Sequence, residues 1–128
     1  MFKKITLIML IALLALAFAG CEQEEATEQP GLANPASVYC QGLGFTEETR
    51  SGEGGEYGVC IFPDGTECDT WAFLGGRCGQ EHSYCLQQGF TLKASNESSI
   101  ATCFFDDNSS CNEFEYQQGQ CKPGDHKP

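Results

Sequence analysis

Residues 60–78 read CIFPDGTECDTWAFLGGRC, and the spacing of their three cysteines decides how the rest of the chain is organised. The same spacing, eight residues and then ten, returns in residues 103–121, CFFDDNSSCNEFEYQQGQC. One more cysteine precedes each stretch, Cys40 in YCQGLGFT and Cys85 in YCLQQGFT. The sequence therefore predicts that one four-cysteine unit occurs twice.

The two units are predicted to be tandem copies, the first over residues 34–78 and the second, diverged copy over residues 79–121. Each copy is expected to be a small disulfide-rich α+β unit of helix, β-hairpin and short helix. Units of this length are too short to bury a self-sufficient core. Disulfides worth roughly 3 kcal/mol each in the chain-entropy model would therefore decide whether a unit folds.

The first copy begins with a helix signal, because Asn34 can cap a helix and Pro35 suits the first helical position. Strand-like residues follow on both sides of a glycine-rich turn. The elements expected here are a helix over residues 35–42, strands over 44–50 and 56–62, and the turn over 51–55.

A three-residue hairpin loop is predicted at Pro63-Asp64-Gly65, where proline starts a turn and glycine takes the left-handed position. Asn108, the next-best left-handed residue, stands at that place in the second copy. The expected register sets Cys60 opposite Cys68, and Cys103 opposite Cys111.

Short helices are expected after these hairpins, over residues 70–74 and 113–118, because Asp69 and Asn112 are good helix caps. Glycines end both segments. The alternative is a strand, since the aromatic spacing of two also fits a strand. The aromatic residues expected in the two cores are Trp71, Phe73, Phe114 and Tyr116.

The N-terminus is predicted to be a lipoprotein signal peptide over residues 1–20. Lys3 and Lys4 form a short basic region, and residues 5–19 form an apolar run. The run ends in FAGC, which resembles the lipobox of prokaryotic lipoproteins and implies lipidation of Cys21. An uncleaved anchor is the alternative. Both interpretations place the remaining chain outside the cytoplasm and on the membrane of the cell envelope.

An acidic, disordered tether is predicted over residues 21–33 and a flexible tail over residues 122–128. Removal of the signal peptide removes two of the seven basic residues, so the net charge falls from −11 to −13. Such an acidic surface repels nucleic acid and anionic lipid, and it could hold cations or basic partners loosely.

Nine cysteines in an exported chain imply an oxidising compartment and disulfide bonds. Metal ligation is the competing interpretation, but zinc ligands usually come in close pairs such as Cys-x2-Cys, which the sequence lacks. We therefore expect no metal and no cofactor. A redox role for Cys60 or Cys68 would need a similar close pair, so a structural role is predicted. The disulfide cysteines are Cys40, Cys60, Cys68, Cys78, Cys85, Cys103, Cys111 and Cys121.

All disulfides are expected to stay within their own copies, which leaves nine of the 105 pairings that eight cysteines allow. The hairpin register favours one pair in each copy, and the other pair then follows by elimination. The predicted pairs are Cys60–Cys68, Cys40–Cys78, Cys103–Cys111 and Cys85–Cys121.

Several motifs of the first copy occur in order: NPASVYC over residues 34–40, GVCIFPDG over residues 58–65, and then Cys68, Trp71, Gly76 and Cys78. This order resembles domain of unknown function 333, a small module of prokaryotic lipoproteins often labelled haemolysins. The second copy lacks the NPAS start, the PDG turn and the tryptophan. The resemblance implies no catalytic residues.

Three classes of function remain open. The leading one is a non-enzymatic envelope lipoprotein whose modules bind or structure something at the surface. The alternative is an inhibitor of an exported protease, with residues 47–56 as its exposed loop. The third is haemolysin activity, for which an amphipathic or long apolar segment after Cys21 would be expected.

No catalytic residues are predicted, because no nucleophile is paired with a base, and His82 and His126 are expected at the surface. Large aromatic side chains carry much of the binding energy of interfaces. Contact is therefore expected on the first copy, although Trp71 could instead belong to the core. The candidate contact residues are Glu53, Tyr57 and Trp71. Asn96 and Asn108 each start a possible N-glycosylation tripeptide.

Overall fold

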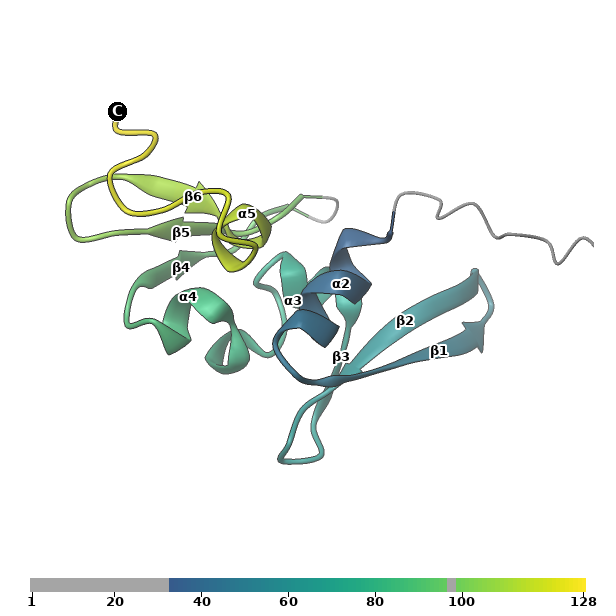
Figure 1. Cartoon of the computed structure of the whole chain (residues 1–128). Helices are drawn as coiled ribbons and strands as arrows, with labels where there is room; N and C mark the ends of the chain where they lie inside the picture. The colour runs from purple at the N-terminus through teal and green to yellow at the C-terminus, as the bar shows by residue number, and fades with distance from the viewer. Residues whose placement is uncertain (1–32, 97–98) are drawn as a thin grey trace, which may run out of the picture. The chain divides into compact units, whose positions relative to one another are not determined.

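The structure is a computed structural model that describes residues 33–96 and 99–128 (Figure 1). The predicted signal peptide, the lipidation of Cys21 and nearly all of the predicted tether lie outside these residues. Among the described helices, none is both long and apolar enough to cross a membrane. The described residues belong to one compact unit.

The first half of this unit combines two helices with a three-stranded antiparallel sheet in the order β1-β2-β3 (Figure 1). The elements are α2 (Pro35–Gly42), β1 (Thr46–Gly52), β2 (Gly55–Ile61), β3 (Glu67–Asp69) and α3 (Thr70–Leu74). The second half holds another antiparallel sheet, in the order β4-β5-β6. Its elements are η2 (Gln80–His82), α4 (Tyr84–Gln87), β4 (Thr91–Lys93), β5 (Thr102–Phe104), β6 (Ser110–Asn112) and α5 (Glu113–Gln117). The α+β class is thereby confirmed.

The predicted helix starts are confirmed by their caps. The side chain of Asn34 accepts a hydrogen bond from the backbone N–H of Ala36 at 3.0 Å. Asp69 accepts from Ala72 at 2.9 Å, and this places the start of α3 at the predicted residue. In the second half, Asn112 caps α5 in the same way at 2.8 Å.

Both predicted hairpin loops are also confirmed. Gly65 has φ of 83° and Asn108 has φ of 66°, so each occupies the left-handed position that ends its loop. The carboxylate of Asp64 accepts a hydrogen bond from the backbone N–H of Thr66 at 3.0 Å, which holds the first loop closed. The strands then pair with Cys60 opposite Cys68, and Cys103 opposite Cys111, as predicted.

The disulfide pairing within each half differs from the prediction. The bonds are Cys40–Cys60, Cys68–Cys78, Cys85–Cys103 and Cys111–Cys121. Each bond stays within its half, as expected. The predicted partners were wrong because Cβ atoms directly opposite each other in an antiparallel pair are about 4.5–5.5 Å apart, whereas a disulfide needs about 3.8 Å. Each strand cysteine instead bonds to a cysteine outside the sheet.

Two apolar clusters form the interior, one in each half. Phe73 is fully buried in the first cluster and packs against the rings of Tyr39 and Phe62 at 5.1 and 4.9 Å. Trp71, expected beside it in the core, is 38% exposed because it lies on the other side of α3. Phe114 was expected in the core of the second half, but it packs against the first cluster.

The two halves meet at a buried polar contact that the sequence did not predict. The hydroxyl of Tyr39, from α2, donates a hydrogen bond to Oε1 of Glu113, from α5. The same carboxylate oxygen accepts from the backbone N–H of Cys85 at 2.9 Å, and the Tyr39 hydroxyl accepts from that of Tyr84 at 2.9 Å. Burial disfavours the charged carboxylate and raises the pKa of Glu113.

Backbone hydrogen bonds also join the halves. The N–H of Ala101 donates to Leu74 at 3.0 Å, and that of Ser95 donates to Gly75 at 2.9 Å. Gly76 follows with φ of 69°, and a Cβ atom there would lie 3.1 Å from the side chains of Ala101 and Leu92. Glycine therefore permits both the backbone turn and the close approach of the second half.

The segment predicted as a flexible tail makes contacts of its own. The N–H of Gly124 donates to the hydroxyl of Ser109 at 2.8 Å, and Lys127 lies 3.7 Å from the carboxylate of Asp107. These contacts bring residues 122–127 back onto the second hairpin loop.

Candidate functional site

The strongest candidate for a contact surface is the hairpin formed by β1 and β2, which Figure 1 shows as an arm extending from the helices. Its strands have seven residues each, whereas β4 and β5 have three. Every residue from 51 to 57 is exposed, so this end of the hairpin buries nothing in the core. A two-stranded hairpin is at best marginally stable in water. Core packing therefore does not explain why β1 and β2 extend beyond the rest of the sheet.

One face of this sheet carries alternating residues of all three strands, and we call it the outer face. Arg50 pairs with Tyr57, Glu48 with Val59, and Ile61 with Glu67. Because directly paired residues point to the same side, these side chains share one face. The outer face consists of Thr46, Glu48, Arg50, Tyr57, Val59, Ile61, Glu67 and Asp69, with Gly52 and Gly55 beside the turn.

Arg50 is held across the outer face by carboxylates. Its guanidinium donates two hydrogen bonds to Glu67, one of them at 2.9 Å, and a third to Glu48 at 3.3 Å. Since β2 lies between β1 and β3, the Arg50 side chain must cross β2 to reach Glu67. Hydrogen bonding to Arg50 lowers the pKa of Glu67. The arrangement keeps the only basic side chain of the hairpin neutralised, so the surface remains acidic.

The structure divides the three predicted contact residues between two elements. Glu53 lies at the turn between β1 and β2, and Tyr57, 43% exposed, lies on the outer face of β2. A Cβ atom added at Gly52 would lie 3.1 Å from the Tyr57 ring, so this ring leans towards the turn that carries Glu53. Trp71 belongs to α3 and adds a second exposed aromatic side chain to the same half.

The predicted protease-binding loop, residues 47–56, is not an open loop. These residues form most of β1, the turn and the start of β2, and they pair from Thr46 and Ile61 to Gly52 and Gly55. The turn itself contains only Glu53 and Gly54. The backbone is therefore already engaged in a sheet along most of this segment.

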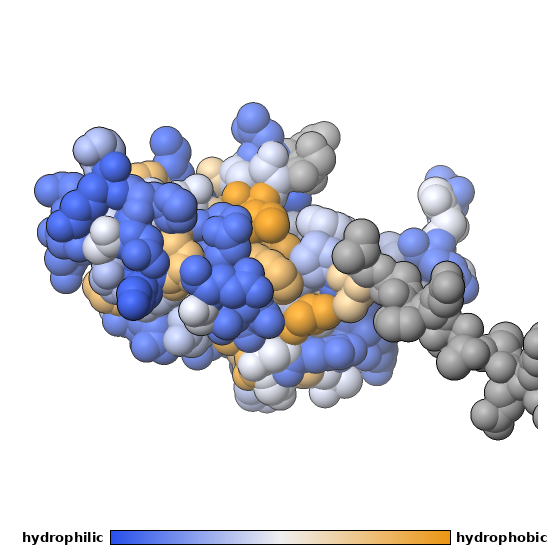
Figure 2. Space-filling model, turned by 45° about the horizontal axis from the view of Figure 1, so that its top comes forward, coloured by the Kyte–Doolittle hydropathy of each residue, from blue (hydrophilic) through white to orange (hydrophobic). Residues whose placement is uncertain are grey.

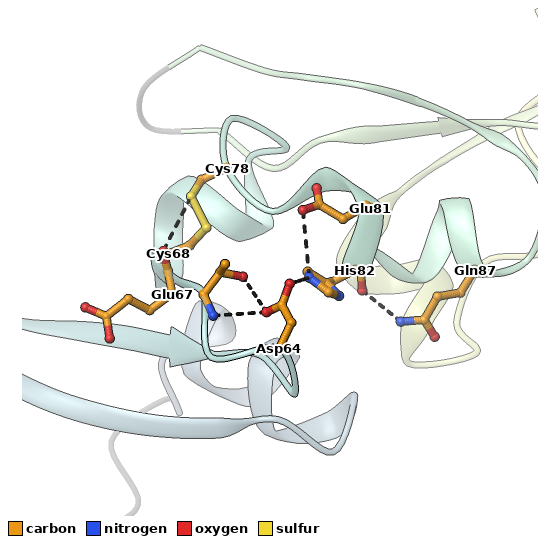
Figure 3. A network of polar contacts seen from close by, with 8 residues as sticks. Asp64, Glu67, Cys68, Cys78, Glu81, His82 and Gln87 are labelled. Carbon is orange, nitrogen blue, oxygen red and sulfur yellow. Dashed lines mark hydrogen bonds and ion pairs between the residues drawn. A yellow bond between two sulfur atoms is a disulfide. The ribbon is translucent and has the colours of Figure 1, made fainter.

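His82 was expected at the surface, but it forms part of the contact between η2 and the first hairpin loop (Figure 3). Its ring stacks on Phe62 with centroids 4.2 Å apart, and its side chain is 20% exposed. Its Nε2 atom lies 3.6 Å from Asp64 and 3.8 Å from Glu81. The hydroxyl and backbone N–H of Thr66 bond to Asp64 and lower its pKa. The stacking of His82 on Phe62 and its approach to Asp64 join η2 to the first hairpin loop.

An open pocket of about 170 Å³ lies beside this network. Its volume is below the range of about 300–1,000 Å³ that is common for small-molecule sites. Its lining is Gly44, Phe45, Thr46, Ile61, Phe62 and Pro63. Phe45 and Phe62 also contact His82, so the pocket borders the join between the first half and η2.

Two groups of side chains in the described residues have the proximity that metal binding requires, but both depend on bonded cysteines. Cys85 and Cys103, which approach Glu113, are bonded to each other. Cys121, which approaches Glu115 and His126, is bonded to Cys111. While these disulfides are intact, the cysteines offer no thiolate to a metal.

The two possible glycosylation tripeptides have different surroundings. Ser109, which follows Asn108, is buried, and its hydroxyl donates to Asp107. Asn96 is exposed, but the tripeptide that it starts continues into residues 97–98, outside the described part. In the loop at Asn108, Asn108 holds the left-handed turn position and Ser109 is engaged with Asp107.

Hydrophilic residues form most of the molecular face that Figure 2 presents. Figure 2 shows apolar residues gathered in the middle of one face, with hydrophilic residues on both sides. This distribution agrees with eighteen acidic residues against seven basic ones in the full chain.

A family model described as domain of unknown function (DUF333) matches residues 31–77. The chain is also 44% identical over 62 residues to uncharacterized protein YoaF of Escherichia coli K12, and the match covers 74% of that protein. The chain belongs to the DUF333 family. The DUF333 match coincides with the first half, which carries the long hairpin, Tyr57 and Trp71.

Other relatives of this DUF333 protein have equally general names. A protein of Shigella flexneri, also named uncharacterized protein YoaF, is 44% identical over 62 residues and is covered to 74% of its length. An uncharacterized protein of Archaeoglobus fulgidus is 33% identical over 72 residues, which are 56% of this chain. The chain spans about a third of the length of that archaeal relative, with 34% covered. No solved structure matches the chain.

Proposed function

We propose that this DUF333 protein is a lipid-anchored lipoprotein of the cell envelope that acts by contact and not by catalysis. The observation that carries the proposal is the β1–β2 hairpin, whose exposed end contributes no core yet presents Tyr57 on the strand that follows the turn carrying Glu53. Tyrosine and tryptophan supply large contact area with few rotatable bonds, which makes them common anchors of interfaces. The second half, in this proposal, supports the first.

The charge of the hairpin indicates the chemistry of its partner. Residues 46–61 contain four glutamates and one basic residue, Arg50, which is held by Glu48 and Glu67. A surface with this charge attracts basic groups and repels acidic ones. The proposed partner is therefore a basic surface of an envelope protein, and not nucleic acid.

The proposed membrane attachment rests on the N-terminal sequence, with its basic start, apolar run and FAGC ending. Replacing Cys21 with Ser removes the thiol that would be lipidated. The Cys21→Ser variant should appear as an unprocessed or soluble form, as shown by metabolic labelling with palmitate and membrane fractionation. Processing and membrane retention equal to those of the wild type would contradict lipidation.

We also propose that the two halves are tandem copies of one unit. The support is the shared frame: three antiparallel strands, paired cysteines on the second and third strands, and a left-handed residue in the loop between them. The disulfides span 20 and 10 residues in the first half, and 18 and 10 in the second.

Capture of partners from the native envelope tests the contact function. The lipidated wild type, Glu53→Lys and Trp71→Ala would be cross-linked in the envelope and their captured proteins compared. Glu53→Lys should remove a basic partner, since it reverses a charge at the exposed turn without touching the core. Capture that is unchanged in Glu53→Lys, together with unfolding of Trp71→Ala by circular dichroism, would contradict the assignment of the hairpin as contact surface.

Two alternatives make different predictions. An inhibitor would lower the activity of an exported protease, although the paired backbone of residues 47–56 gives less support to this than an open loop would. A haemolysin would lyse red cells at micromolar concentration. The contact function predicts no hydrolase activity, no catalytic redox turnover and no lytic activity of the purified chain, so lysis in that assay would favour the haemolysin instead.

A further inference from the structure

The four disulfides of the described residues differ in how well they are protected from solvent. Cys78 is only partly buried, and its partner Cys68 is 6% exposed. The other six bonded cysteines are at most 2% exposed. Thiol–disulfide exchange requires a thiolate to reach a sulfur atom, so access limits its rate. The Cys68–Cys78 bond is therefore the one that a reductant in solution can approach.

The corresponding bond of the second half provides a matched comparison. Cys111–Cys121 also joins residues ten apart, from the third strand to the segment after the short helix. Here the chain turns back after Cys121: Sγ of Cys111 lies 3.8 Å from the Lys122 carbonyl oxygen, and Gly124 bonds to Ser109. After Cys78 the chain continues through Gly79 into η2. Residues 122–125 thus cover one bond, whereas within residues 33–96 and 99–128 no such returning segment covers its counterpart.

We propose that Cys68–Cys78 is a site of thiol–disulfide exchange that accepts two electrons from a dithiol. A thiolate of the dithiol attacks Sγ of Cys78, a mixed disulfide forms, and the Cys68–Cys78 bond breaks. The electron pair of the broken bond leaves on Sγ of Cys68, which takes up a proton. The second thiol of the dithiol then attacks the mixed disulfide and releases Cys78 as a thiolate, which is protonated in turn. The dithiol leaves as a disulfide.

The surroundings of the two sulfur atoms determine which one is attacked. A Cβ atom at Gly79 would lie 3.1 Å from Sγ of Cys68 and 2.6 Å from the Phe62 ring, so Gly79 and Phe62 crowd Cys68. Cys78 is partly buried, and its Sγ atom lies 4.0 Å from the carbonyl oxygen of Glu67 (Figure 3). Attack therefore occurs at Cys78, and Cys68 is the leaving group.

Opening this bond affects the join between the halves. The bond closes the loop from residue 68 to residue 78, which contains α3 and the carbonyl groups of Leu74 and Gly75. Those carbonyl groups accept the hydrogen bonds of Ala101 and Ser95 from the second half. Arg77, next to Cys78, donates to the carbonyl of Asn96 at 2.8 Å. Reduction therefore loosens residues 68–78, whose carbonyl groups accept hydrogen bonds from the second half.

Differential alkylation of the full-length chain tests the proposal. The native protein is treated with dithiothreitol, samples are quenched with N-ethylmaleimide over time, and the labelled cysteines are identified by peptide mapping. Labelling of Cys68 and Cys78 should be at least roughly tenfold faster than labelling of Cys111 and Cys121, because access differs. Equal rates, or faster labelling of Cys111 and Cys121, would overturn the proposal.

Removal of the cover provides the control. Deletion of residues 124–128 should raise the reduction rate of Cys111–Cys121 towards that of Cys68–Cys78 and leave the latter rate unchanged. If the deletion leaves the rate of Cys111–Cys121 as low as before, exposure does not explain the difference. Hydrogen exchange of the Ser95 and Ala101 amides measures the loosening. Both amides should exchange faster in the Cys68→Ser, Cys78→Ser double variant, and unchanged exchange would overturn the link between the bond and the join.

Discussion

The segment that connects the first two strands of each sheet, β1 to β2 and β4 to β5, has different contacts in the two halves of this protein. In the first half it is a tight turn at the end of a long hairpin, and residues 51–57 are all exposed. In the second half it includes Ser95 and Ala101, which donate hydrogen bonds to Gly75 and Leu74. Two similar three-stranded sheets therefore differ in their first connection. It is exposed to solvent in the first half, and in the second half it is hydrogen-bonded to the other half. The comparison predicts distinct effects of matched substitutions.

The largest expected difference concerns the two cores. Phe73 of α3 is fully buried among three aromatic rings, whereas Tyr116, its counterpart on α5, is half-buried. Phe73→Ala should lower the free energy of unfolding by about 3–5 kcal/mol through lost burial and a cavity. Tyr116→Ala should cost clearly less. Chemical denaturation with intact disulfides measures both values, and equal losses would show that the two cores contribute alike.

The next effect concerns the buried carboxyl at the join. Gln in place of Glu113 would place two N–H donors where Oε2 lies, an atom without a hydrogen-bond partner among the described residues, whereas a protonated carboxyl places only one O–H donor there. Glu113→Gln should therefore lower the free energy of unfolding by about 1–2 kcal/mol near pH 5. Glu115→Gln, in the same helix, serves as the control and should have little effect.

The same carboxyl gives a pH dependence with a definite sign. Burial raises the pKa of Glu113 above its ordinary value of 4.5, so the native state binds this proton more tightly than the unfolded chain. Its contribution is fully present below the ordinary value and is lost as the pH rises through the raised value. The difference in unfolding free energy between wild type and Glu113→Gln should therefore shrink as the pH rises above 4.5. A difference that stays constant or grows would contradict a raised pKa of the buried Glu113 carboxyl.

The smallest expected effect compares the two hairpin loops. Gly65→Ala forces a side chain into the left-handed region and should cost about 1–2 kcal/mol. Asn108→Gly places the preferred residue at the equivalent position, so stability should be unchanged or slightly higher. Thermal unfolding of both variants checks this. A loss in Asn108→Gly as large as in Gly65→Ala would mean that the loops are not equivalent.

These loops also show what could be predicted from the sequence. The left-handed positions of Gly65 and Asn108, and the caps at Asn34 and Asp69, depend on neighbours a few residues away. Local chemistry was therefore sufficient to place the turns and the helix starts, and with them the register of the cysteine strands.

The remaining features depend on packing between distant segments. Cys60 bonds to Cys40 because α2 packs on the sheet, which the hairpin pattern alone does not indicate. Glu113 resembles an ordinary surface glutamate at a helix start until Tyr39 of the other half contacts it. The candidate contact site was only partly predicted: the hairpin was expected to be important, but the exposure of Trp71 depends on which side of α3 meets the core.

The central claim is that contact occurs on the hairpin of the first half, and one comparison of matched aromatic residues tests it most directly. Tyr57 on β2 is 43% exposed, and Phe104 on β5 of the second half is 41% exposed. The affinity of the full-length chain for a partner captured from the native envelope would be measured for Tyr57→Ala and Phe104→Ala. The account predicts that Tyr57→Ala weakens binding by about tenfold or more, or about 1.4 kcal/mol, while Phe104→Ala leaves it unchanged. Equal weakening by both variants, or weakening by Phe104→Ala alone, would contradict the claim.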